Sequence, residues 1–290
     1  MKLNFTKMHG CGNDYVYIDC IKEHIDISDK SLLSQKISDR HFGVGSDGLI
    51  FINPSKKADF EMEMYNADGS RAQMCGNGIR CVAKYVYDHG YTDKTEFTIE
   101  SAGSVKQIFV YPENGCAKTV TVDMGEPILT SSDIPVTSVG DTVISGPIYV
   151  DGKPYKMTCV SMGNPHAVIF TGLPDSCDLD LSSFEIEKIG PLFENHVRFP
   201  QRTNTEFVRV IDRNHMEMRV WERGAGETLC CGTGCCACAV AGVLNDHTDP
   251  EVKISVLGGE LSVRWDRKSN HVFMTGPAET VFTGTYDHRE

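Results

Sequence analysis

The amino-acid sequence predicts an α+β protein with two pseudo-symmetric lobes, each a curved, mainly antiparallel sheet around one central helix. The chain has 290 residues, which is long for one domain and comfortable for two of about 100–150 residues each. Several segments recur in the same order at an offset of about 156 residues. One recurring segment is Cys-Gly-x-Gly, and a helical pattern follows each of its copies.

The internal repeat rests on four pairs of segments. Residues 61–66 align with 217–222, and the Cys-Gly-x-Gly of residues 75–78 aligns with that of residues 231–234. Near the same offset, residues 12–18 resemble 163–169, and 97–103 resemble 252–258. Two unrelated domains with similar glycine-rich turns would not keep both order and spacing. We therefore expect a first lobe of residues 1–126 and a second lobe, its repeat, that begins at residue 127.

Strand-like runs rich in β-branched and aromatic residues are common, whereas helical patterns are few. A helix is expected over Ile79–Asp88, with apolar residues on one face, and another over Cys235–Leu244, which is apolar all round and therefore buried. The Ser-, Thr- and Pro-rich segment 130–140 is expected to connect the lobes. The expected strands are 15–18, 49–52, 60–65, 143–150, 167–170, 216–221 and 252–256.

Charge and hydropathy exclude several classes of function. Lys and Arg total 28 against 40 Asp and Glu, a net charge of -12, and no basic cluster would bind nucleic acid or an anionic membrane. No apolar run approaches the roughly 20 residues of a membrane span, and residues 1–7 lack a signal peptide's apolar stretch. We expect a soluble, cytoplasmic protein whose 12 cysteines are mostly reduced.

The two Cys-Gly-x-Gly turns favour a reactive thiol over a structural one, because both copies occupy equivalent positions. Their glycines leave the backbone N–H groups of the helix open to a ligand, and a helix N-terminus binds anions. The same field lowers a thiol pKa from about 8.5 toward neutrality. Cys75 and Cys231 therefore each combine an acid/base group with a socket for a carboxylate.

Two such thiols suit the inversion of a carbon centre. If the lobes face each other across a cleft that holds the active site, one thiolate removes a proton and the opposite thiol delivers one to the other face. The helix N-termini would stabilise the carbanion's carboxylate. This scheme requires neither a metal nor pyridoxal phosphate, so no cofactor is expected.

Longer motifs carry a resemblance to a known family. Residues 8–14 (MHGCGND), 65–70 (YNADGS), 74–81 (MCGNGIRC), 163–166 (GNPH), 221–228 (WERGAGET) and 276–279 (GPAE) resemble the diaminopimelate epimerases, almost end to end. The resemblance implies cofactor-independent interconversion of LL- and meso-diaminopimelate, which supplies lysine and peptidoglycan synthesis. It also implies that a C-terminal tail, residues 276–290, returns to the first lobe, which ends the second at residue 275.

The resemblance assigns roles by motif. It makes Cys75 and Cys231 the acid/base pair and His166 and Glu222 the groups that poise the thiols. Arg223 suits the distal carboxylate through a bidentate fork. Some members have a substrate-contacting glutamine where this chain has Gly48. The expected substrate-binding residues are Asn13, Asn66, Gly76, Asn77, Asn164, Asn204, Glu222, Arg223, Gly232 and Thr233.

Two alternatives remain open. A proline racemase-like enzyme would share the fold, but such enzymes tend to have histidine where this chain has Asn77, and they need no Arg223. A metal or redox site would use the Cys-x-x-Cys of residues 235–238, but no second such pair exists, and packing explains Cys235, Cys236 and Cys238, as it does Cys230. The expected partner is the small-molecule substrate; the sequence leaves open whether the chain forms a homodimer.

Overall fold

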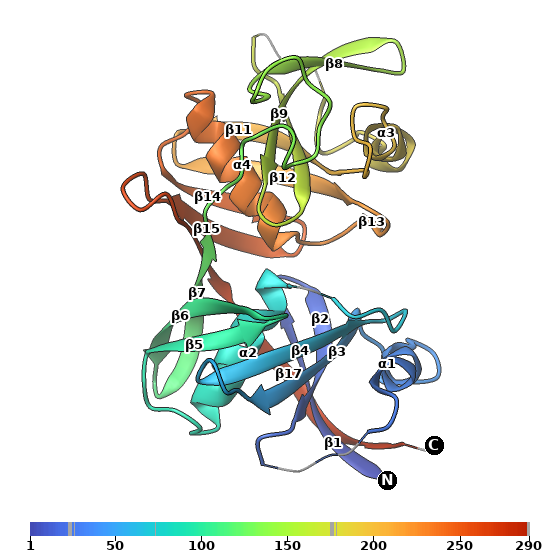
Figure 1. The fold of residues 1–290 in the computed structure, drawn as a ribbon, viewed down its shortest axis with the longest axis vertical. Helices are drawn as coiled ribbons and strands as arrows, with labels where there is room; N and C mark the ends of the chain where they lie inside the picture. Colours follow the sequence, from blue (N-terminus) through green and yellow to red (C-terminus); the bar gives the residue numbers. More distant parts are fainter. Residues whose placement is uncertain (23–24, 26, 73, 175–176, 178, 289–290) are drawn as a thin grey trace. The chain divides into compact units, whose positions relative to one another are not determined.

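The computed structural model describes residues 1–22, 25, 27–72, 74–174, 177 and 179–288. The chain forms two compact units (Figure 1). The first comprises Met1–Asp123 and Thr275–Glu290, and the second comprises Met124–Met274.

Three of the strands that the sequence predicts, 15–18, 49–52 and 60–65, form in the first unit. In β4, for example, every second residue is buried. Its strands pair in the order β17-β1-β2-β3-β4-β5-β6-β7, with parallel pairing only between β2 and β3 and between β4 and β5. The elements are β1 (Lys2–Gly10), β2 (Asn13–Asp19), α1 (Lys30–Ser38), β3 (Gly48–Pro54), β4 (Phe60–Asn66), α2 (Gly76–Asp88), β5 (Glu96–Ser101), β6 (Ser104–Glu113), β7 (Cys116–Gly125) and β17 (Glu279–Asp287).

The second unit repeats this connectivity. Its strands pair in the order β8-β9-β10-β11-β12-β14-β15, with β13 on the end of β12, and only β10–β11 and β12–β14 are parallel. The elements are β8 (Gly146–Val150), β9 (Lys153–Ser161), β10 (Pro165–Thr171), α3 (Ile186–Glu194), β11 (Asn204–Asp212), β12 (His215–Glu222), β13 (Gly226–Glu227), α4 (Gly232–Leu244), β14 (Glu251–Val256), β15 (Gly259–Trp265) and β16 (Val272–Pro277), on which the chain returns to the first unit.

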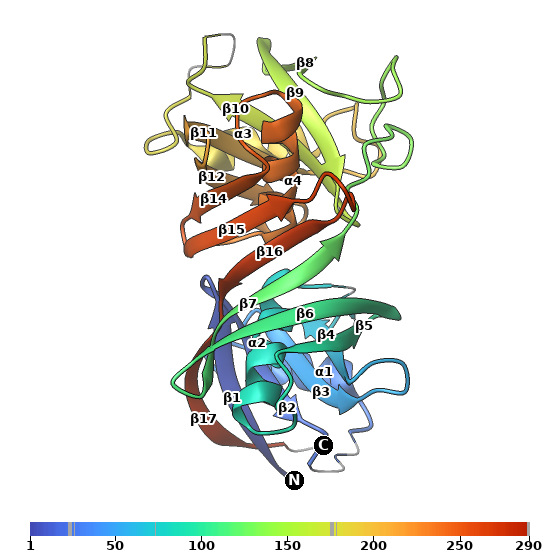
Figure 2. The same cartoon turned by 90° about the vertical axis from the view of Figure 1, so that its left-hand side faces the viewer.

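The two units therefore share one order of elements and one sense of pairing. In each, a helix (α1 or α3) crosses between two parallel strands, and a second helix (α2 or α4) crosses between the next parallel pair. Sheet strands curve around α2 in the first unit and around α4 in the second (Figures 1 and 2). The structure is thus α+β, with a mainly antiparallel sheet around a central helix in each unit.

The central helices are almost entirely buried. Residues 235–241 of α4 are fully buried, as the all-round apolar sequence predicts. In α2, residues 76–83, 85 and 86 are buried, and the enclosed guanidinium of Arg80 donates to the carbonyls of Gly76 and Pro277. Each helix begins at its first Cys-Gly-x-Gly glycine, three residues earlier than expected, with the preceding cysteine at the N-cap position. The Cys75 side chain accepts from the N–H of Gly78, whereas Cys231 makes no such side-chain cap.

Two other predictions from the sequence need correction. The strand expected over 143–150 begins only at Gly146, since Ser145 has a φ of 50°, which no strand residue adopts; Val143 packs into the core instead. Helices α1 and α3 were not expected. The segment expected to connect the lobes, 130–140, lies inside the second unit and forms turns; the chain passes between the units after Asp123 and after Met274 instead.

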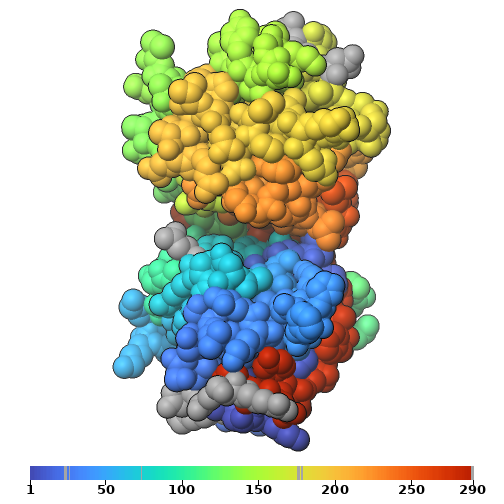
Figure 3. Space-filling view, turned by 90° about the vertical axis from the view of Figure 1, so that its right-hand side faces the viewer, coloured from blue at the N-terminus to red at the C-terminus, as the bar shows by residue number. Residues whose placement is uncertain are grey.

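The end of the chain completes the first unit. β17 pairs antiparallel with β1 along its whole length, from Lys2 opposite Asp287 to His9 opposite Glu279. Figure 3 shows the red residues of this tail against the blue residues of the chain's start. Among the residues that the structure describes, no helix is long and apolar enough to cross a membrane.

Candidate active site

Cys75 forms the N-cap of α2, and its sulfur lies among hydrogen-bonding groups. The backbone N–H of Gly78 donates to Sγ at 3.3 Å, and the thiol donates to Asn13 Oδ1 at 3.2 Å. Asn77 donates to the same Oδ1 at 3.4 Å and accepts from Arg80 at 2.9 Å. The side chain of Asn13 in turn donates to Asp47 at 2.8 Å. Three of the expected site residues in the first unit, Asn13, Cys75 and Asn77, thus form one network, on the backbone that includes Gly76.

Burial has a larger effect on the pKa of the Cys75 thiol than the N-terminus of the helix has. It raises the pKa of Cys75, although the N–H groups of Gly78 and Asn77 and the charge of Arg80 act in the opposite direction. The sequence suggested a pKa lowered toward neutrality, so this expectation was wrong for the ligand-free protein. Cys75 is therefore protonated at neutral pH.

Asn66 is the expected site residue that stands apart in the first unit. It ends β4, and its amide donates to Ser70 at 3.0 Å rather than to the Cys75 network. Its neighbour across the sheet is Gly48, where an added Cβ would lie 2.2 Å from the carbonyl oxygen of Tyr65. No larger residue fits at position 48 in this arrangement.

Cys231 is the N-cap of α4 and lies among acidic groups. Its Sγ lies 3.5 Å from Thr233 Oγ1 and hydrogen bonds with Glu222, which also accepts from Thr228. Burial and the charges of Glu222 and Glu206 raise the pKa of Cys231 well above its usual value, and burial also raises the pKa of Glu222. Cys231, like Cys75, is therefore protonated in the free protein.

The other expected residues of the second unit surround Cys231 in two hydrogen-bonded groups. His166 Nε2 lies 3.0 Å from Asn164 Oδ1, and Asn164 Nδ2 donates to Thr233 Oγ1 at 3.2 Å. Asn204 Oδ1 accepts from the backbone N–H of Arg223 at 2.8 Å. The side chain of Arg223 is exposed and donates to the carbonyl of Gln201 at 3.0 Å. The backbone N–H groups of Gly232 and Thr233 begin α4 beside the thiol.

Two residues next to the thiols were not expected from the sequence. Tyr15, on β2, hydrogen bonds with Cys75, and Glu206, on β11, hydrogen bonds with His166. A carboxylate in the middle of an apolar strand, two residues after Asn204, was the available signal for Glu206. Among the described residues, no group of three or more His, Cys, Asp or Glu side chains is arranged to hold a metal ion.

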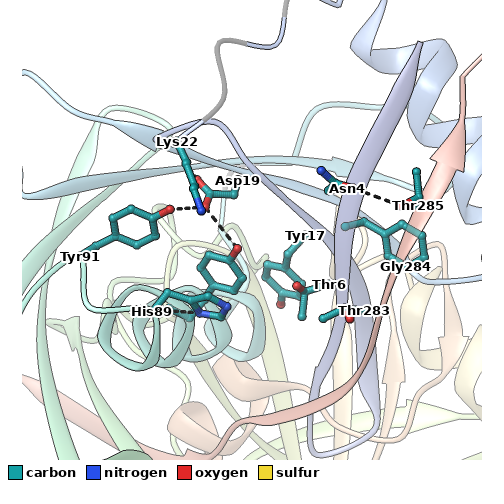
Figure 4. Close-up of a pocket in the computed structure, with 12 residues that line it drawn as sticks. Asn4, Thr6, Tyr17, Asp19, Lys22, His89, Tyr91, Thr283, Gly284 and Thr285 are labelled. Atoms are coloured by element: carbon teal, nitrogen blue, oxygen red, sulfur yellow. Dashed lines mark hydrogen bonds between the residues drawn. The ribbon is translucent and has the colours of Figure 1, made fainter.

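A polar hollow in the first unit lies away from Cys75. It has a volume of about 450 Å³ and lies at the other end of α2, where Tyr85 and Tyr91 donate to Asp19 (Figure 4). A helix of 13 residues separates the two places by about 20 Å. The hollow therefore shares no residue with the Cys75 network.

Comparison with known proteins places the chain in a family. The family model for diaminopimelate epimerase matches residues 5–130 and 158–281. The chain belongs to the diaminopimelate epimerase family. The diaminopimelate epimerase of Agathobacter rectalis is 55% identical over 292 residues, covering 98% of this chain and 99% of that protein. That of Methanococcus maripaludis strain S2 is 51% identical, covering 98% and 100%.

More distant solved structures share the epimerase fold. A Bacillus anthracis protein of the phenazine biosynthesis PhzF family superposes with a TM-score of 0.72 at 15% identity, covering 99% of this chain and 100% of that chain. A hydroxyproline epimerase from Agrobacterium vitis, with bound trans-4-hydroxy-L-proline, gives 0.69 at 12% identity, covering 98% and 92%. The chain is an isomerase of the epimerase type, on a fold shared with racemase-like enzymes.

Proposed function

We propose that this chain interconverts LL- and meso-diaminopimelate, with Cys75 and Cys231 as the acid/base pair. The observation that carries the proposal is the pair of thiols, each capping the first turn of a buried central helix at equivalent places in a repeated topology. Catalysis by two thiols needs no cofactor. A reducing compartment such as the cytoplasm keeps both thiols free.

The proposed step moves one proton in and one out. A thiolate takes the α-proton, the carbanion's charge spreads into the substrate carboxylate, and the opposite thiol protonates the other face of the carbon. The backbone N–H groups of Gly76 and Asn77, and of Gly232 and Thr233, supply donors for that carboxylate at two helix N-termini. The substrate ammonium lowers the pKa of a nearby thiol, which offsets the effect of burial at Cys75 and Cys231.

Recognition of the second amino acid group belongs, in this proposal, to a further set of polar side chains. Arg223 binds the distal carboxylate, Glu222 accepts from the distal ammonium, and Asn13, Asn66, Asn164 and Asn204 supply amides. The Arg223 guanidinium is exposed and donates to the main-chain carbonyl of Gln201, a partner that a substrate carboxylate can replace. A proline racemase would have no use for this second set of groups.

The test is to incubate the reduced protein with LL-diaminopimelate, without cofactor, in D2O. We expect meso product that carries solvent deuterium on the inverted carbon, and recovered substrate with little deuterium. Cys75→Ala and Cys231→Ala should each abolish inversion while keeping deuterium exchange into one epimer, and the two variants should prefer opposite epimers. Cys81→Ala and Cys236→Ala, which remove buried thiols from the same two helices, serve as controls and should invert normally. Return of the substrate's own proton to the product would refute the two-thiol mechanism.

A further inference from the structure

Glu206 is a fully buried carboxylate near the start of β11, on the strand face that also carries Asn204 and Val208. Its neighbours across the sheet are Val168 on β10 and Val220 on β12, both buried. Oε1 lies 2.6 Å from His166 Nδ1, whereas Oε2 has no hydrogen-bond partner among the described residues. A buried carboxylate with one unpartnered oxygen costs stability, so its presence calls for an explanation.

The first unit shows that the fold does not need this carboxylate. Tyr15 pairs with Gly48 in the first unit as His166 pairs with Asn204 in the second, and two residues further on stand Ile50 and Glu206. An added Cβ on Gly78 would lie 2.8 Å from Ile50 Cδ1, and one on Gly234 would lie 2.7 Å from Glu206 Oε1. An isoleucine and a glutamate therefore occupy equivalent places under the first turn of α2 and of α4.

A chain of hydrogen bonds leads from Glu206 to the sulfur of Cys231. His166 Nε2 donates to Asn164 Oδ1, since that oxygen can only accept, and one further proton lies between Nδ1 and Oε1 of Glu206. Asn164 Nδ2 donates to Thr233 Oγ1, which leaves the Thr233 hydroxyl proton free to point at Sγ, 3.5 Å away. Each link pairs groups that can donate and accept, and a Thr233 hydroxyl that donates to Sγ favours the thiolate.

We propose that Glu206 is a positioning residue for the reaction at Cys231: it fixes the His166 ring and, through Asn164 and Thr233, sets a hydroxyl donor on the reacting sulfur. The inference rests on the proposed function, in which Cys231 is an acid/base group. It also makes the two thiols unequal, because Ile50 supplies no such chain to Cys75. Glu206 does not touch the substrate in this proposal.

Other titratable groups face the hydrogen-bonded series that runs from Glu206 to Cys231. Glu222 on β12 faces both Cys231 and His166, and Cys159 on β9 and Cys238 on α4 face Glu206. The negative charge of Glu206 itself raises the pKa of Cys231, whereas the hydrogen bond from Thr233 lowers it. Removal of the charge and removal of the hydrogen bond should therefore shift the titration of Cys231 in opposite directions.

Two substitutions separate these effects. Glu206→Gln removes the charge but keeps an oxygen that accepts from His166, and Glu206→Ile introduces the residue that the first unit has at the equivalent place. We expect kcat to fall roughly 10–100-fold in Glu206→Ile, by analogy with the outer partners of metal-bound histidines. The fall should be smaller in Glu206→Gln, and KM should stay within about twofold in both, because substrate contacts are untouched.

The second readout is the rate at which iodoacetamide alkylates Cys231 as a function of pH, followed by peptide mass spectrometry. The midpoint should move to lower pH in Glu206→Gln, and Glu206→Ile should lie above Glu206→Gln. Cys75, measured in the same samples, is the internal control and should keep its midpoint. Val220→Ala, which thins the same buried layer, should lower the melting temperature without moving either midpoint.

The outcomes are distinguishable. Parental kcat and an unmoved Cys231 midpoint in Glu206→Gln would overturn the proposal, and this variant alone decides if Glu206→Ile does not fold. A parent chain that does not convert diaminopimelate would refute the proposed function, while the alkylation profiles would still show whether Glu206 acts on Cys231. Equal shifts at Cys75 and Cys231 would mean a general loss of structure and would also overturn the proposal.

Discussion

The backbone of Arg223 is held in place by the fold, whereas its guanidinium is exposed to solvent. Its backbone is fixed, because the N–H donates to Asn204 Oδ1, but its guanidinium is exposed and makes one hydrogen bond to a main-chain carbonyl. A planar fork with five donors, held at its base and free at its tip, suits a carboxylate that arrives from solution. At the residue scale, Arg223 is thus positioned by its backbone, and its guanidinium is available to bind the distal carboxylate.

Arg223→Lys tests whether Arg223 binds the distal carboxylate. Lysine keeps the charge but loses the bidentate geometry, so we expect substrate binding to weaken by about 1.5–3 kcal/mol, the scale of one hydrogen bond to a charged group. The quantity to measure is the dissociation constant of diaminopimelate for a Cys75→Ala background, which binds without turnover. Arg213→Lys, at a surface turn where Arg213 pairs with Asp246 and Asp249, is the matched control and should bind like its parent.

The sequence singles out some site residues and hides others for a physical reason. Cys75 and Cys231 stand out because the two halves can be aligned on their glycines, and the glycines are needed where Ile50 and Glu206 press on the helices. Glu206 does not stand out, because a lone acidic residue in a strand is usually solvent-facing. Only the register of β10 against β11 shows that it lies beside His166.

At the scale of elements, helices α2 and α4 are predictable, and α1 and α3 are not. The first pair follows a distinctive turn, and α4 is apolar on every face. By contrast, α3 contains Pro191 and Gly190, both poor helix formers, and forms because tertiary packing outweighs propensity. An added Cβ on Gly190 would lie 2.4 Å from the ring of Trp221, so the glycine allows the helix to lie against β12.

Alanine substitution at the equivalent helical glycines should have unequal effects. Gly78→Ala presses on Ile50 Cδ1, the end of a side chain that can turn aside, whereas Gly234→Ala presses on Glu206 Oε1, which His166 holds. We expect Gly234→Ala to lower the free energy of unfolding by about 1–3 kcal/mol more than Gly78→Ala does. Urea unfolding of the two variants checks this. Equal losses would show that Glu206 can move at little cost.

At the scale of the whole molecule, the chain holds an unusual store of buried, un-ionised thiols. None of the 12 cysteines, all of which lie among the described residues, forms a disulfide, and the pKa of both Cys81 and Cys159 is raised by burial to about 12. An unfolded chain ionises these thiols near pH 9, so above that pH the unfolded state binds fewer protons than the folded state. The stability that these thiols contribute is present below about pH 9 and is lost as the pH rises toward 12.

The free energy of unfolding should therefore fall as the pH rises above neutrality, because the buried thiols ionise more readily in the unfolded chain. Each of Cys81 and Cys159 should cost about 1.4 kcal/mol of unfolding free energy between neutral pH and pH 10, where both are still largely protonated in the folded state. The measurement is urea unfolding from pH 7 to pH 10.5 under reducing conditions. Cys81→Ala should have a lower stability at pH 7 but a shallower decline, whereas Cys116→Ala, at an exposed thiol, should decline like the parent. Parallel declines in all three would contradict this account.

The pairing of β1 with β17 has a consequence for biosynthesis. β1 is among the first segments to leave the ribosome, and its partner on one side is among the last, so one edge of the first unit's sheet stays open while almost the whole chain is made. At 5–20 residues per second this interval is on the order of 15–60 s. An open edge of this kind recruits other strands, and a nascent chain that exposes one is a natural client for a holding chaperone. The second unit is one continuous segment of the chain, so its sheet does not depend on a strand that is made much later. The second unit is therefore able to complete its fold before the first.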